Sequence, residues 1–191
     1  MKKILLILFV VIVYSFTTYT SKTIYIQPLG NVNQNYLNYV KKSVTEFYGY
    51  KCIIKPKVNL TKDILTVSKS RYEASKILNK FNSKHNIIII TEEDIAYRKN
   101  SSFPEWGIFG LGLRPGKICV VSTFRLKKGV NTKQMLVRLK KVSLHEIGHN
   151  LGLLHCNKHK DCLMNDAKGT IKQVDREKIW FCNKCSKIIN N

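Results

Sequence analysis

The residues best suited to chemistry form the segment His-Glu-Ile-Gly-His-Asn-Leu-Gly-Leu-Leu-His in the last quarter of the chain. On a helix, His145 and His149 are four positions apart, so both imidazoles project from one face toward a common point. Glu146 lies one position further round, where its carboxylate can reach a metal-bound water without binding the metal. Gly152 tolerates the positive φ that ends a helix, and the turn after it can bring in His155 as a third ligand. The spacing predicts a catalytic zinc site with three imidazole ligands and an open fourth position.

A bare His-Glu-x-x-His pattern also occurs by chance, in charged amphipathic helices whose histidines face the solvent. That interpretation explains neither Gly152 nor His155, whose offsets match a third zinc ligand that follows a turn. We therefore favour the zinc site.

A second group of metal ligands follows the histidines. Four cysteines lie within 30 residues: Cys156, Cys162, Cys182 and Cys185. The last two form a Cys-x-x-Cys pair, whose tight turn lets two thiolates share one tetrahedral ion, so a structural zinc site is predicted. In an exported protein the competing interpretation is two disulfides. The remaining cysteines, Cys52 and Cys119, each fall within a predicted strand, where we expect buried free thiols; a disulfide would require neighbouring strands.

The N-terminus has the pattern of a secretory signal, because Met1-Lys2-Lys3 precedes an apolar run of 11 residues from Ile4 to Tyr14. Such a run is shorter than a typical transmembrane span. No Ala-x-Ala pair follows it, so residues 1–20 are either a cleaved signal peptide or a retained anchor that associates with the membrane. Residues 21–191 then form one exported domain, either secreted, periplasmic or membrane-anchored.

Hydrophobic periodicity predicts strands and helices in one domain, without internal repeats. The run Asn86–Thr91 is rich in β-branched residues without alternation, as expected for a central strand buried on both faces. A long helix that begins at Asn131 or Thr132 carries the histidines. Its buried stripe is expected to consist of Leu144, Ile147, Leu151 and Leu154. The other predicted elements are strands at 23–27 and 51–58, helices at 31–48 and 69–81, and a hairpin of 108–113 with 118–123.

The charge of the chain is strongly basic, with 33 Lys and Arg against 12 Asp and Glu in 191 residues, a net charge of +21. Its 44% hydrophobic and 24% charged residues are typical of a folded protein. Such a surface attracts anions, although a lysine-rich composition bias gives the same excess. No acidic residue lies between Glu105 and Glu146, a stretch that includes Arg114 and Lys117 on the hairpin turn. Strand 118–123 is the predicted edge that pairs with an extended peptide. We expect Arg114 and Lys117 beside it to contact acidic residues of the substrate; the alternative is that these basic side chains only face the solvent.

Together the motifs resemble those of the archaemetzincin family of zinc metallopeptidases, in the metzincin clan. The resemblance rests on His-Glu-x-x-His-x-x-Gly-x-x-His-Cys, then Cys-x-Met, 17 residues and Cys-x-x-Cys. Upstream, segments 26–30, 91–94 and 109–112 are also similar to family segments. Five residues separate Cys156 from Cys162, where the family usually has four.

The resemblance implies a compact α/β single domain with a mixed β-sheet, an active-site helix and a small C-terminal segment held by zinc. It assigns Glu146 as general base and then acid, and Met164 as the methionine turn. It implies two zinc ions, a catalytic one on His145, His149 and His155 and a structural one on the four cysteines. We expect a monomer that hydrolyses a peptide or protein, with no nucleic-acid partner. The alternative is a non-catalytic, zinc-stabilised basic module that binds anionic surfaces or nucleic acid; the intact Glu146 argues against it.

Overall fold

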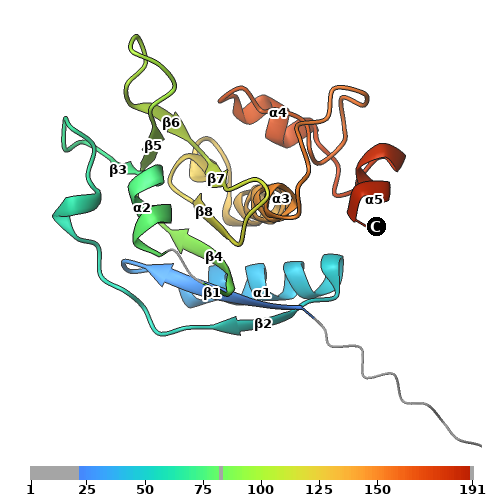
Figure 1. Cartoon of the computed structure of the whole chain (residues 1–191), viewed down its shortest axis with the longest axis horizontal. Coiled ribbons are helices and arrows are strands. Elements are labelled where there is room, and N and C mark those ends of the chain that lie inside the picture. The colour runs from blue at the N-terminus through green and yellow to red at the C-terminus, as the bar shows by residue number, and fades with distance from the viewer. Residues whose placement is uncertain (1–21, 82–83, 190–191) are drawn as a thin grey trace, which may run out of the picture.

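A five-stranded mixed sheet forms the centre of the molecule, in the order β2-β1-β4-β8-β7 (Figure 1). The computed structural model describes residues 22–81 and 84–189. The strands of this sheet are β1 (Thr23–Leu29), β2 (Lys51–Ile54), β4 (Asn86–Thr91), β7 (Gly110–Gly112) and β8 (Ile118–Ser122). The first three and β8 run parallel, whereas β7 is antiparallel to β8. The predicted mixed α/β domain is confirmed.

The central strand β4 is covered on both faces, as its sequence predicts. Ile88 and Ile90 face helices α1 (Gln34–Tyr48) and α3 (Thr132–Asn150), and both are fully buried. Ile87 and Ile89 face the other side, where they pack with residues of helix α2 (Ala74–Lys80). Because neither face meets water, the strand has no polar alternation.

A small second sheet lies beside the central one, in the order β3 (Tyr72–Glu73), β5 (Ile95–Tyr97) and β6 (Trp106–Ile108). The predicted helix at 69–81 is therefore wrong in its first turn. Tyr72 and Glu73 pair in parallel with Ile95 and Ala96, and the helix begins only at Ala74. Tertiary pairing overrides the helical spacing of the apolar residues here.

Helix α3 is the element that presents the histidines. It begins as predicted at the N-cap Asn131, whose side chain accepts from the N–H of Gln134 in a capping box. It ends at Asn150, and Gly152 follows with a φ of 96°, the positive value that the helix end requires. One member of the predicted stripe is wrong, because Leu154 lies beyond the helix and is 60% exposed.

The hairpin of β7 and β8 forms as predicted, but its two strands exchange the expected roles. Ile118–Ser122 is hydrogen-bonded to β4 on one side and to β7 on the other, so it is not an edge. All five of its residues are buried. The edge on this side of the sheet is Gly110–Gly112, which pairs only with β8 in the described part of the chain, and β2 forms the opposite edge.

The C-terminal segment contains two short helices, α4 (Ile171–Arg176) and α5 (Asn183–Ile189), drawn in orange and red in Figure 1. Single turns of 3₁₀-helix, η1 (Lys62–Ile64) and η2 (Arg125–Lys127), complete the described elements. No helix within residues 22–81 and 84–189 is long and apolar enough to cross a membrane. The signal or anchor predicted at residues 1–20 lies outside the described residues.

Candidate active site and metal centres

Three imidazoles converge at the C-terminal end of α3. One ring nitrogen each from His145, His149 and His155 lies within 4.8 Å of the other two. The Nε2 atoms of His149 and His155 are 3.2 Å apart. Zinc–nitrogen bonds of tetrahedral geometry would place two ligand nitrogens about 3.3 Å apart, so the three residues fit a zinc ion.

Main-chain carbonyls fix the orientation of the two helical imidazoles. The Nδ1 of His145 lies 2.7 Å from the carbonyl oxygen of Leu163, and that of His149 lies 2.8 Å from that of Leu153. Because a carbonyl can only accept, each Nδ1 carries the proton and each Nε2 has a free lone pair for a metal. Burial lowers the pKa of His145 to about 3 and also lowers that of His149, so both rings are neutral ligands at pH 7.

The carboxyl group of Glu146 lies between α3 and β7, in a cavity of about 680 Å³ that the three histidines also line. Its residue is 7% exposed, and the main-chain N–H of Gly112 donates to the carboxylate. Burial raises the pKa of Glu146 to about 8 against the effect of that hydrogen bond. A Cβ on Gly110 would lie 2.7 Å from the Glu146 side chain, so the close approach of β7 requires glycine.

Met164 lies directly beneath the active-site helix. It is fully buried, and a Cβ on Gly148 would lie 2.6 Å from its sulfur. Gly148, between the two helical histidines, therefore lets the methionine pack against the helix backbone. This is the place that the sequence predicts for a methionine turn.

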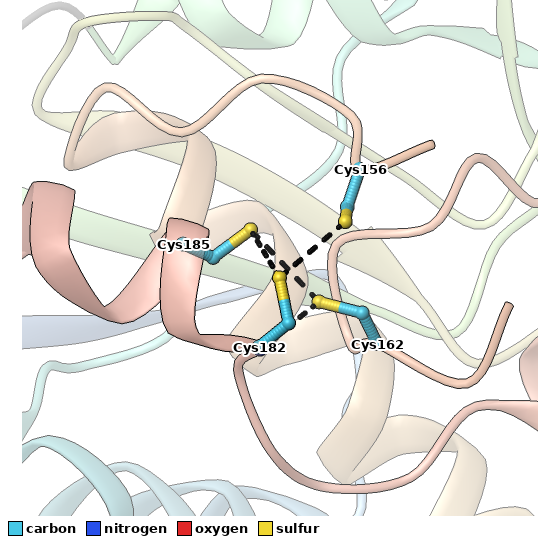
Figure 2. Close-up of side chains that lie close together, drawn as sticks. All are labelled: Cys156, Cys162, Cys182 and Cys185. Atoms are coloured by element: carbon cyan, nitrogen blue, oxygen red, sulfur yellow. Dashed lines mark hydrogen bonds between the residues drawn. The ribbon is translucent and has the colours of Figure 1, made fainter. Parts of the chain in front are cut away.

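The four C-terminal cysteines form a compact cluster, and all four thiols are buried and unbridged (Figure 2). The sulfur of Cys182 is 3.6 Å from that of Cys156 and 3.7 Å from that of Cys185, which in turn lies 3.9 Å from that of Cys162. Four sulfurs bound tetrahedrally to zinc would be about 3.8 Å apart, so the cluster fits a zinc ion rather than two disulfides.

The two candidate metal sites share one short stretch of chain, because His155 and Cys156 are consecutive. The N–H of Cys156 donates to the carbonyl of Met164 at 2.6 Å, which closes the loop between them. Leu163, whose carbonyl orients His145, donates its own N–H to the carbonyl of Trp180 at 3.0 Å. The cysteine cluster thus holds the segment that orients a histidine.

The two remaining cysteines are buried free thiols, as expected. Cys52 lies on β2 and Cys119 on β8, with β1 and β4 between them. Strands that far apart do not permit a disulfide.

The structure separates the two basic residues predicted to contact substrate. Arg114 lines the cavity. Lys117 lies outside it, lines a second pocket and donates to the main-chain oxygen of Lys84 at 3.3 Å. Trp106 and Glu177 also line the cavity. No sequence motif singles out either residue, since each comes from a different segment of the fold.

Residues 9–191 match Peptidase family M54, and the chain therefore belongs to this family of zinc metallopeptidases. It is 34% identical over 168 residues to "Archaemetzincin" of Methanocaldococcus jannaschii, covering 85% of this chain and 89% of that protein. It is 28% identical over 175 residues to "Archaemetzincin" of Halobacterium salinarum, covering 86% and 97%.

Solved structures with the same fold agree with this assignment. The crystal structure of archaemetzincin from Archaeoglobus fulgidus, complexed with malonate, superposes with a TM-score of 0.77 at 28% identity. It covers 87% of this chain and 99% of that one. Archaemetzincin from Methanopyrus kandleri shares the fold, with a TM-score of 0.75 at 22% identity over 91% and 97% of the two chains.

Proposed function

We propose that this zinc metallopeptidase cleaves peptide bonds in the cavity between β7 and α3, with Glu146 as its general base. The observation that supports this assignment is the position of Glu146: a buried carboxyl group, held by the N–H of Gly112, lines the same cavity as three convergent imidazoles. A general base must lie within reach of the proton that it removes, and the neighbouring imidazoles define where the reacting water would be.

We assign a catalytic zinc to His145, His149 and His155, and a structural zinc to the cysteine cluster. The catalytic ion, when bound, would polarise the scissile carbonyl and make water acidic enough to react near neutral pH. The positive charge of that ion would lower the pKa of Glu146, so that its carboxylate could take the proton of the attacking water and pass it to the leaving amine. The low pKa of His145 keeps its imidazole neutral and available as a ligand.

The outer edge of β7 is proposed to bind the substrate backbone. The N–H of Ser122 donates to the carbonyl of Phe109 at 2.9 Å, and the N–H of Leu113 donates to the carbonyl of Ile118 at 3.1 Å. In the antiparallel pattern, the polar backbone groups of Gly110 and Gly112 therefore face away from β8. The N–H of Gly112 donates to the Glu146 carboxylate, so the groups of this edge left for a substrate are the N–H of Gly110 and the carbonyls of Gly110 and Gly112. An extended peptide can pair with this edge as an added strand.

Glu146→Gln tests the mechanism in the full chain, loaded with zinc and incubated with a mixed-peptide library whose products are identified by mass spectrometry. The amide keeps the size of the side chain but cannot accept the proton. We expect cleavage by the wild type and a loss of about 10² to 10⁴-fold in the variant, with its zinc content unchanged. Glu46→Gln on the exposed face of α1 is the matched control and should cleave like the wild type.

Normal turnover by Glu146→Gln would rule out this mechanism. If the folded, zinc-loaded wild type cleaved nothing but bound anions in a salt-dependent way, the non-catalytic basic module would be favoured instead. The same cleavage data test a contact of Arg114 with acidic residues, which would be enriched at one position of the cut peptides.

We also propose that the chain is exported, on the basis of the basic and apolar pattern of residues 1–20. Sequencing the N-terminus of the protein purified from its native cells would distinguish a removed signal from a retained anchor, and a cytoplasmic location of the intact chain would refute export.

A further inference from the structure

Glu177 is a second buried carboxyl group in the wall of the catalytic cavity. It follows α4 immediately, its residue is 4% exposed, and it lines the same cavity as His145 and Glu146. The mechanism proposed above uses only one buried carboxyl group. A buried carboxyl group is costly unless it is paired or neutral, so Glu177 requires an explanation.

The protein offers Glu177 only weak partners. Among the described residues, its carboxylate accepts one hydrogen bond, from Nε2 of Gln173 at 3.5 Å. Lys141 on α3 lowers the pKa of Glu177 by its positive charge, but its ammonium donates to the carbonyls of Val174 and Asp175 at 2.8 and 2.9 Å. No lysine or arginine nitrogen of the described chain lies within 4.0 Å of the Glu177 carboxylate.

The other charged groups nearby do not supply the missing partner. Arg138 on α3 is paired with Asp175 at 2.7 Å. Asp166, on the loop after Met164, adds a repulsive negative charge. Burial, the largest cause, raises the pKa of Glu177 to about 8, partly offset by Gln173 and Lys141. Burial therefore favours the neutral acid, and a cation beside Glu177 would stabilise the carboxylate.

The surroundings of Glu177 fit a side chain with an apolar stem and a charged end. Val142, one turn before His145, lines the cavity together with Val174 and Ala167. Lysine and arginine pack their methylene groups against apolar walls while the charged end seeks a polar partner. A free α-amino group has the same charge but no stem to contact these residues.

We propose that Glu177 is a specificity-determining residue that receives a lysine or arginine side chain of the peptide substrate. This inference rests on the proposed peptidase function, because it places the side chain in the cavity where cleavage occurs. Lys99, Arg114 and Lys168 also line the cavity, but none of them forms an ion pair with Glu177 within 4.0 Å, so they remain able to contact acidic residues of the same peptide.

The test compares peptides that differ at one position, chosen from the sites that the wild type cuts in the library. That position carries lysine, norleucine or acetyl-lysine, so that the stem is kept while the charge is removed. A second pair of peptides has a free or an acetylated N-terminus. We expect lysine to exceed norleucine by about tenfold to a hundredfold in kcat/KM, as for a hydrogen bond to a charged group, and N-terminal acetylation to have little effect.

Two variants assign the preference to Glu177. Glu177→Gln keeps the shape of the side chain but cannot form an ion pair, and should reduce the ratio of lysine to norleucine to about one with zinc content unchanged. Asp161→Asn is the matched control, because it removes a carboxylate that pairs with Lys178 at 2.9 Å outside the cavity. It should keep the wild-type ratio.

A binding measurement separates this inference from the peptidase assignment. Calorimetry with the zinc-loaded Glu146→Gln variant should give a dissociation constant about tenfold lower for the lysine peptide than for the norleucine peptide. This measurement does not require cleavage. If the wild type cleaves no peptide, hexapeptides that contain arginine, lysine or norleucine serve as probes. Equal binding of these peptides would overturn the proposal. A preference that follows the free N-terminus, or one that persists in Glu177→Gln, would also overturn it. If Glu177→Gln fails to fold, the comparison of lysine with norleucine in the other proteins decides.

Discussion

At the scale of single residues, Gly112 sets the distance between the sheet edge and the general base. A Cβ at this position would lie 2.8 Å from the main-chain oxygen of Glu146 and 3.3 Å from the Cβ of His149. Both of those atoms belong to the 19-residue helix α3, which is packed against the sheet and cannot easily move. The three-residue edge strand must therefore move instead.

Gly112→Ala should displace β7, remove the N–H that holds the Glu146 carboxylate and misalign a peptide on the strand edge. We expect kcat/KM to fall by about tenfold or more, because small misplacements near reacting atoms are costly. Overpacking should lower the free energy of unfolding by about 1–3 kcal/mol. Zinc content should not change, since His145 and His149 stay on α3 and His155 lies on the turn after it, not on β7. Peptide kinetics, metal analysis and denaturant unfolding measure these quantities, and wild-type kcat/KM would show that the strand has room.

Site residues on one helix, or on the turn directly after it, could be identified from sequence, because helix geometry fixes their relative positions. His145, His149 and Glu146 are in this class, and the spacing of His155 indicates a turn. Gly112 and Glu177 could not be identified in this way, because they lie on other segments and only the tertiary fold brings them to the cavity. Nothing in the local sequence of Glu177 distinguishes it from an exposed glutamate.

At the scale of elements, the pair of Arg138 and Asp175 attaches α4 to α3. Arg138 is 6% exposed, and its guanidinium donates to both carboxylate oxygens of Asp175 at 2.7 Å. It also donates to the carbonyls of Leu126 and Lys128 at 2.9 and 3.0 Å. The guanidinium stays charged, and it lowers the pKa of Asp175 through these hydrogen bonds.

Asp175→Asn should loosen α4, because a buried guanidinium loses its bidentate carboxylate. Asp175 is about half exposed, so we expect a loss of about 1–2 kcal/mol in the free energy of unfolding rather than the larger cost of a fully buried pair. Urea unfolding at neutral pH measures it. Asp63→Asn is the control: Asp63 pairs with Lys80 on the surface, and its loss should have almost no effect. Equal changes in the two variants would contradict this role of Arg138.

Element types were predictable where the local sequence pattern is strong, as in the β-branched run of β4 and the capped helix α3. The prediction of a helix at 69–81 was wrong in its first turn because Tyr72 and Glu73 pair with strand β5. The edge of the sheet was misassigned because both strands of the hairpin are apolar, and only their order beside β4 decides which one is interior. Strand order depends on long-range pairing, which a single-sequence period does not contain.

At the scale of the whole molecule, the C-terminal segment depends on the cysteine cluster. Few hydrophobic residues pack with the four cysteines: the buried Leu153 and Met164, and the partly buried Trp180, Phe181 and Ile189. The same segment contributes Leu163, Met164 and Glu177 to the active site. A segment with so small a core needs a metal or a similar constraint to stay folded.

Cys185→Ala therefore tests whether the two metal sites depend on each other. We expect the variant to bind one equivalent of zinc instead of two, because three thiolates no longer complete a tetrahedral site. Leu163 should then hold His145 less firmly, and since such outer contacts tune metal affinity, the remaining zinc should be removed by chelators at about tenfold to hundredfold lower concentration. Zinc titration by calorimetry and chelator competition measure both effects.

Cys52→Ala, which removes a buried thiol on β2, outside both sites, is the control and should keep two equivalents. Two equivalents in Cys185→Ala would contradict a structural zinc bound by all four cysteines. One equivalent with unchanged chelator resistance would show that the catalytic site does not depend on the cysteine cluster.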